Sequence, residues 1–139
     1  MKQIVTLFIF TSIIFAATIN IPADYTTIQA GINASVNGDT VLVAQGTYSE
    51  NLILANEIVL ASYAIYDDLD SQWLDNDNIN NTIISGTHSG SCLIVRDGNI
   101  EPTVFGFTFQ NGTGTNMAIT KCGVMKSERS GGAILLYKA

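Results

Sequence analysis

Residues 21–51 read IPADYTTIQAGINASVNGDTVLVAQGTYSEN, and they combine a short helix, a glycine turn and a strand. Thr26 and Gln29 fit the capping box that opens a helix, in which each side chain satisfies a free backbone amide. One narrow apolar stripe follows at helical spacing, formed by Ile28, Ile32 and Val36. Asn37-Gly38-Asp39 predicts the end of the helix. A helix of about three turns is too short to be stable in water by itself, so it must pack on other elements.

Short strand patterns fill most of the remaining chain. Residues 40–44 predict a strand with apolar side chains on both faces, so other elements must pack against both of its faces. Further strands are predicted at residues 52–54, 58–60, 82–85, 91–95, 104–109 and 133–139. Turn residues separate them, and corresponding strands recur about every 20 to 30 residues, as in repeats that stack on their neighbours. Residues 66–78 and 115–130 lack this pattern and are predicted to be loops.

The same residues carry a resemblance to a known fold family. The skeleton TIQ, GDTV and G-Y-E in residues 26–50 resembles the N-terminal region of pectin-lyase-like proteins, including pectin methylesterases and large secreted bacterial proteins. The resemblance covers roughly residues 21–114 and 131–134. It implies an all-β fold, the right-handed parallel β-helix (a solenoid), with a short N-terminal capping α-helix. In pectin methylesterases the catalytic groups lie beyond the matched region, so the resemblance assigns no catalytic residue here.

Charge and composition limit the classes of molecule that this chain is expected to bind. The 139-residue chain has 6 Lys and Arg against 12 Asp and Glu, a net charge of −6. Proteins that bind nucleic acid or anionic membranes need clustered basic residues. No such cluster is visible along the sequence. We therefore expect no nucleic-acid partner, and a polysaccharide is the ligand class to consider.

The N-terminus indicates export. Lys2 precedes an apolar run from Ile4 to Phe15, and small residues follow. This is the layout of a secretory signal peptide, and the run is short for a membrane span. We predict a signal peptide at residues 1–18 and one domain at residues 19–139, secreted or on the cell surface. An uncleaved anchor is the alternative.

Two cysteines leave two interpretations open. Cys92 and Cys122 could form a disulfide in an exported protein. Alternatively, Cys92 is a small buried core residue within an apolar run. No cysteine or histidine spacing suggests zinc.

One acidic loop supplies the candidate ligand-binding residues. Its carboxylates are Asp67, Asp68, Asp70, Asp75 and Asp77. Asp75 and Asp77 alternate as calcium ligands do, but the loop lacks the glycine and the distal glutamate of a calcium motif, so a solvated loop is the simpler interpretation. Trp73 is a candidate for stacking on a sugar ring, or it covers apolar strands. We expect no other cofactor.

The remaining chemically notable residues do not assemble a predicted active site. Tyr48 and Glu50 belong to the resembling motif, and we expect Tyr48 to pack at a corner and Glu50 to bind backbone donors. His88 lies in a turn without a base partner in the sequence. No catalytic residue is predicted.

The last predicted strand, residues 133–139, is apolar and would expose an unpaired edge. We expect that further repeats follow it in a longer protein or that a second chain pairs with it. The favoured function is an exported, structural or carbohydrate-binding segment without a complete active site. The alternative is the N-terminal part of a polysaccharide-active enzyme of the pectin esterase or lyase type.

Overall fold

The computed structural model describes residues 15–68, 73, 75–96, 99–121 and 124–137. Most of the signal peptide predicted at residues 1–18 lies outside these ranges, as do Asp70 and Cys122. The described residues are mainly β structure with two short α-helices, α1 (Ile28–Ala34) and α3 (Asp77–Asn80), and one 3₁₀ helix, η1 (Tyr63–Tyr66). No helix among them is long and apolar enough to cross a membrane.

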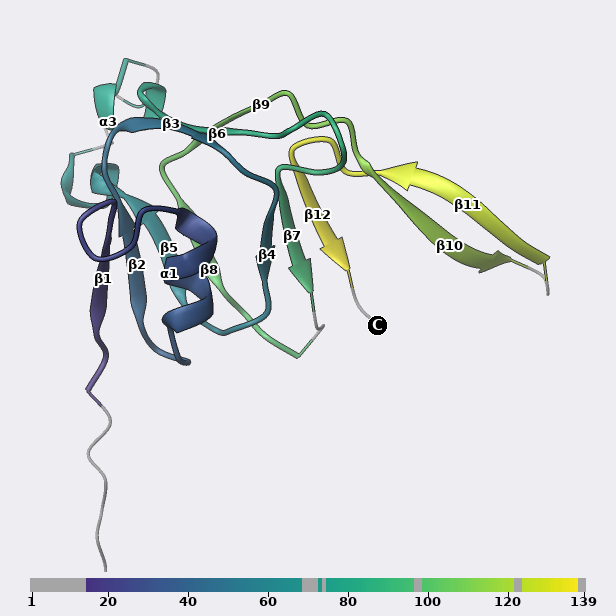
Figure 1. Ribbon diagram of the computed structural model, residues 1–139, viewed down its shortest axis with the longest axis horizontal. Coiled ribbons are helices and arrows are strands. Elements are labelled where there is room, and N and C mark those ends of the chain that lie inside the picture. The colour runs from purple at the N-terminus through teal and green to yellow at the C-terminus, as the bar shows by residue number, and fades with distance from the viewer. Residues whose placement is uncertain (1–14, 69–72, 74, 97–98, 122–123, 138–139) are drawn as a thin grey trace, which may run out of the picture.

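Three small parallel sheets make up the body of the protein (Figure 1). The first sheet has the order β1 (Thr18–Ile21), β2 (Thr40–Val43), β5 (Val59–Ser62) and β8 (Thr103–Phe105). The second has the order β3 (Gly46–Ser49), β6 (Thr82–Ser85) and β9 (Thr108–Gln110). The third has the order β4 (Leu52–Leu54), β7 (Leu93–Arg96) and β12 (Ile134–Tyr137). The chain therefore visits the sheets in turn, and each visit adds a strand beside the previous one.

The predicted fold class is wrong. The sequence predicted an all-β solenoid with one capping helix. The described strands instead lie in four separate small sheets, one of them antiparallel, and two α-helices and a 3₁₀ helix accompany them. The strands are only three or four residues long in the parallel sheets because turns interrupt them. The single strand predicted at residues 104–109 is two strands, since Gly106 adopts a φ of +78° between them. A Cβ at Gly106 would also overlap Ser62 and Ala64.

The antiparallel sheet was missed entirely. Residues 115–130, predicted to be a loop, form a hairpin of β10 (Thr115–Lys121) and β11 (Val124–Ser130), seven residues each, paired from Thr115↔Ser130. Figure 1 shows it projecting from the body. It also brings onto one element Lys121, Lys126 and Arg129, half of the chain's six basic residues, which look scattered in the sequence.

The hydrophobic core lies between the three parallel sheets and α1. Its buried members come from α1, from six of the described strands (β1, β2, β4, β5, β6 and β7) and from adjoining residues: Ile21, Ile28, Ile32, Val41, Val43, Leu52, Leu54, Ile58, Leu60, Ile84, Cys92 and Leu93. The strand at residues 40–43 is buried on both faces, as its apolar pattern predicted. The helix α1 contacts β1, β2 and β4, and thus covers one end of this core. Burial of apolar surface holds so short a helix in place.

The helix is shorter than its sequence pattern predicted. Thr27, not Thr26, is the N-cap, and its Oγ1 accepts a hydrogen bond from the Ala30 amide at 3.2 Å. The helix ends at Ala34, so Val36 is not part of the buried stripe and is 57 % exposed. Gly31 permits the close packing of α1 on β1, because a Cβ there would lie 2.8 Å from Ile21 Cδ1.

Candidate functional site

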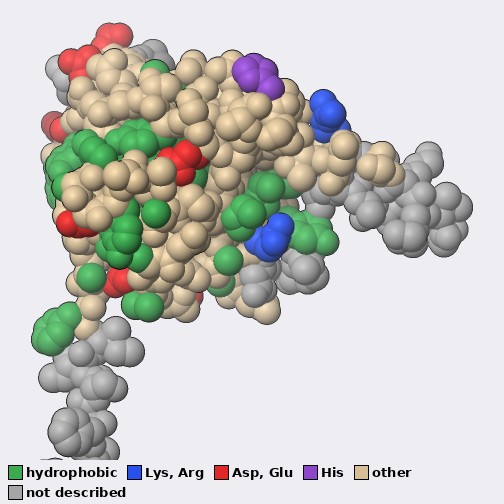
Figure 2. Space-filling model, in the orientation of Figure 1, with side chains coloured by type: hydrophobic (Ala, Val, Ile, Leu, Met, Phe, Trp, Pro, Cys, Tyr) green, Lys and Arg blue, Asp and Glu red, His purple; other side chains and the backbone are tan. Residues whose placement is uncertain are grey.

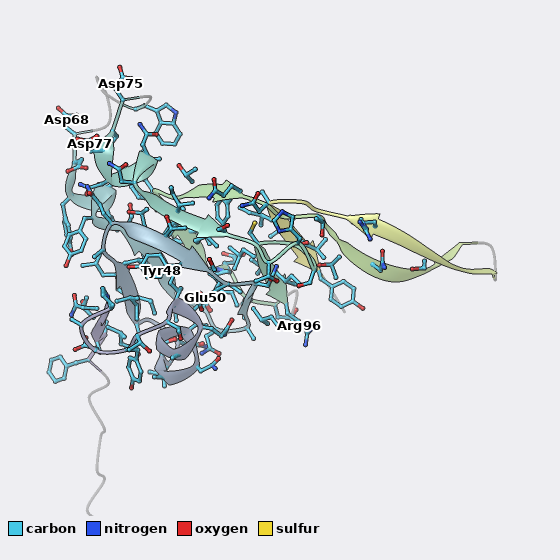
Figure 3. All side chains as sticks on the ribbon, turned by 45° about the horizontal axis from the view of Figure 1, so that its top comes forward. Tyr48, Glu50, Asp68, Asp75, Asp77 and Arg96 are labelled. Carbon is cyan, nitrogen blue, oxygen red and sulfur yellow. The ribbon has the colours of Figure 1, made fainter. Side chains whose placement is uncertain are left out.

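The residues proposed for calcium do not form a metal site in the described structure. Figure 3 places Asp68, Asp75 and Asp77 at one corner, near η1 and α3. Asp75 and Asp77 are both exposed, and Asp77 lies in the first turn of α3. Within residues 15–137, apart from the undescribed gaps, no group of three or more His, Cys, Asp or Glu side chains could hold a metal ion.

Asp67 has a structural role at the same corner. Its Oδ2 accepts hydrogen bonds from the side-chain amides of Asn78 at 2.8 Å and Asn76 at 2.9 Å. These two donors hold the pKa of Asp67 below its usual value. Asn76 in turn caps α3 by accepting from the Ile79 amide. The carboxylate therefore ties the loop to the start of α3.

Trp73, the candidate for sugar stacking, is 58 % exposed. More than half of the Trp73 side chain is therefore accessible to solvent and is not buried against a strand. It is also not among the residues that line the groove described below.

Tyr48 and Glu50 have the structural roles that the sequence predicted. The Glu50 carboxylate accepts from the backbone amides of Ile28 at 2.9 Å and Gln29 at 3.0 Å, at the N-terminus of α1. The Tyr48 hydroxyl donates to the Ala44 carbonyl at 2.9 Å. Burial raises the pKa of Tyr48, and the negative charge of Glu50 raises it further. Figure 3 shows both residues well away from the acidic corner.

His88 lies in an exposed turn and has a φ of +61°. Its carbonyl accepts from Thr113 Oγ1, which links the turn to the next strand connection. Nearby, Asn51 Oδ1 accepts from the amide and the hydroxyl of Thr87. These contacts fix backbone turns, and they give His88 no partner for catalysis among the described residues.

Cys92 is a completely buried, unbonded thiol. Its Sγ donates to the Gln110 carbonyl at 3.2 Å. It packs against Gly112, where a Cβ would lie 2.8 Å from the sulfur. The burial of Cys92 agrees with the prediction that it is a small core residue. Cys122, the other half of the alternative disulfide, lies outside the described residues.

A shallow groove lies between α1 and β4. Its volume is about 600 Å³, and none of its lining residues is charged: Gln29, Ile32, Asn33, Asn51, Ile53, Ala55 and Asn56. We call it the α1–β4 groove. Ile53, from the middle of β4, is 38 % exposed.

Gln29 closes the base of this groove. Its Oε1 accepts from the Ile53 amide at 2.7 Å, and its Nε2 donates to the Ile53 carbonyl at 3.1 Å. One side chain thus makes both hydrogen bonds that a neighbouring strand would make with Ile53. The capping-box pattern identified Gln29 as a structural residue but gave it the wrong partner, because a partner 24 positions away leaves no local signal.

At the other end of the molecule, the described residues provide no comparable cover. β8, β9 and β12 are each the last strand of their sheet in the described structure. We call these three edges the open end, and α1 with the β1 and β4 edges the closed end. On β12, Ile134 is 41 % exposed and Leu136 is 76 % exposed. An apolar hollow of about 400 Å³ lies beside them, lined by Val95, Ile100, Glu101, Pro102, Val104, Ile134 and Leu136.

Comparisons of this chain with models of protein families, with curated proteins and with solved structures found no match. The resemblance to pectin-lyase-like proteins therefore stays a prediction from the sequence.

Proposed function

We propose that this chain is a non-catalytic structural module of an exported protein, and that the open end is its working surface. The observation that carries the proposal is the difference between the two ends of the same stack of sheets. One end has a helix and a side-chain amide in place of the next strand. The other presents three strand edges that no described helix or side-chain amide covers in this way.

The closed end supports the proposal because it shows how this fold ends a sheet. α1 buries Ile28 and Ile32 over the first strands. Gln29 satisfies the backbone of Ile53 at the edge of β4. Unpaired strand edges attract other strands, and proteins commonly cover or charge them.

The open end has the opposite character. Its edge strand β12 has the sequence Ile-Leu-Leu-Tyr, without the Lys, Pro or inward-pointing charge that blocks pairing. The exposed Leu136 and the adjacent apolar hollow would gain from burial. An added strand of polypeptide satisfies both the backbone and the apolar groups, as in recognition by strand addition. We propose that its source is a second copy of this chain.

Export is part of the proposal because residues 1–18 have the layout of a signal peptide. The alternative, a part of a polysaccharide-active enzyme, has no observation in its favour among the described residues. Asp75, Asp77 and His88 are exposed, and Glu50 is committed to two backbone donors.

The test compares two equally drastic substitutions at the two ends. Leu136→Lys places a charge at the open edge, and Val36→Lys places the same charge at an exposed apolar residue next to α1. We expect the unmodified full chain to associate with rising concentration in light scattering. Leu136→Lys should abolish this association, and Val36→Lys should leave it intact. A chain that is monomeric at every concentration, or equal association in both variants, would refute the proposal.

A further inference from the structure

We propose that the α1–β4 groove binds a neutral carbohydrate. The proposal is independent of the structural role proposed for the open end, because the groove lies at the closed end and is built by different residues.

The dimensions of the groove fit a small ligand. About 600 Å³ is within the range of ordinary ligand pockets, roughly 300 to 1,000 Å³. Its two walls are held at a fixed spacing, since Gln29 bridges from α1 to the backbone of Ile53 in β4. A preformed site loses less entropy when a ligand binds.

Two carboxamides on opposite walls have hydrogen-bonding groups left over. Asn33 Oδ1 accepts from Gln29 Nε2 at 2.9 Å, which fixes the amide and leaves its Nδ2 donors unpaired within the described structure. Asn56 Nδ2 donates to the Ser35 carbonyl at 2.9 Å, and its Oδ1 has no partner among the described residues. The groove therefore offers a fixed donor on the helix wall and a fixed acceptor on the strand wall.

Apolar side chains line the groove as well. Ile53 and Ala55 line it, and Ile53 is substantially exposed. A sugar ring combines hydroxyl groups at its rim, which both donate and accept, with C–H groups on its faces. This combination matches a groove that offers a free donor, a free acceptor and apolar side chains.

The charge distribution favours a neutral sugar over a uronic acid. The groove contains no Lys or Arg that could pair with a carboxylate. Arg96, labelled in Figure 3, lies at the end of β7, the strand that pairs with β4, and it is not among the residues that line the groove. Figure 2 shows Asp and Glu side chains, in red, on the part of this face that carries α1. A chain of net charge −6 also repels a polyanion at long range. An extended peptide is a poorer fit, because Gln29 already occupies the backbone groups of Ile53.

The test measures binding of cellohexaose and of hexagalacturonate to the full chain by isothermal titration calorimetry. Asn33→Asp keeps the oxygen that accepts from Gln29 and removes the free donors. Asn56→Ala removes the free acceptor. Asn116→Ala, an exposed asparagine on β10, is the matched control.

We expect the neutral hexamer to bind more tightly than the charged one. Each groove variant should weaken its binding about 5- to 20-fold, the usual effect of losing one or two hydrogen bonds. The control should bind as the original chain does, and unchanged melting temperatures would show that the variants fold. Absence of binding at millimolar sugar, tighter binding of hexagalacturonate, or an equal loss in Asn116→Ala would overturn the proposal.

Discussion

The closed and open ends of this protein are built on the same three sheets, yet they treat their outermost strands in opposite ways. At the closed end, backbone groups of Ile53 and the first turn of α1 are satisfied by the side chains of Gln29 and Glu50. At the open end, β12 exposes Ile134 and Leu136 beside an apolar hollow. Among the described residues, side chains take the place of a missing strand at the closed end, and the open end has apolar side chains at its edge instead.

The largest effect should come from a charge in the core under α1. Ile32 is almost completely buried, so Ile32→Asp should cost at least about 3 kcal/mol of unfolding free energy. Leu136→Asp at the open end should cost less than about 0.5 kcal/mol. Urea unfolding measures both values. Similar costs at the two positions would mean that α1 does not seal the core.

A smaller effect should follow from Glu50→Gln. The carboxylate accepts two charge-assisted hydrogen bonds from the first amides of α1, and the neutral amide would weaken both. We expect a loss of about 1 to 2 kcal/mol in the same unfolding assay. Glu57→Gln, at an exposed glutamate, is the control and should change the free energy little. Equal unfolding free energies of the two variants would mean that Glu50 does not stabilise the start of α1.

Gln29→Ala should turn the closed end into a second open one. The loss of its bonds to Ile53 and Asn33 should cost about 1 kcal/mol, since these groups are partly solvated. More importantly, the freed β4 edge should increase concentration-dependent association in light scattering. Gln45→Ala removes an exposed glutamine whose side chain bonds, among the described residues, to the Asn78 side chain, and it should leave association unchanged. If Gln29→Ala associates no more than this control, the amide does not protect the edge.

The smallest effect should appear only in acid. The backbone amides of Val36 and Ala17 donate to Asp39 and lower its pKa below the ordinary 3.8. A lowered folded-state pKa stabilises the protein above the unfolded value, and the stabilisation disappears as the pH falls through the folded value. Melting temperature should therefore fall more steeply below about pH 4 in the original chain than in Asp39→Asn. Parallel curves would show that Asp39 does not link Ala17 to the exit of α1.

The local elements were largely predictable because their signals are local. The apolar stripe of Ile28 and Ile32 indicated the helix, and the β-branched run at residues 40–43 indicated a buried strand. The structural roles of Tyr48 and Glu50 also followed from their motif. By contrast, nothing in the sequence distinguishes Asn33 and Asn56 from the other asparagines. They become candidate ligand-binding residues only because the fold brings α1 and β4 together.

The failures have physical causes as well. The hairpin at residues 115–130 was predicted to be a loop because its two segments, TNMAITK and VMKSERS, mix polar and apolar residues without the alternation that indicates a strand. The fold class was wrong because short strand signals do not specify how many sheets they form or whether all pairs are parallel. Val36 fits the helical stripe, but the helix ends before it.

The sequence by itself determined several of the extended segments, such as the strand at residues 40–43, the start of α1 to within one residue, and the net negative charge. These properties depend on neighbouring residues and on composition. Only the tertiary structure decided that Gln29 covers the edge of β4, that Cys92 is enclosed by Gly112, and that β12 lies at an uncovered edge. Each of these depends on contacts between residues roughly 20 or more positions apart. Bringing such residues together costs chain entropy, and this cost is compensated only when the whole core assembles.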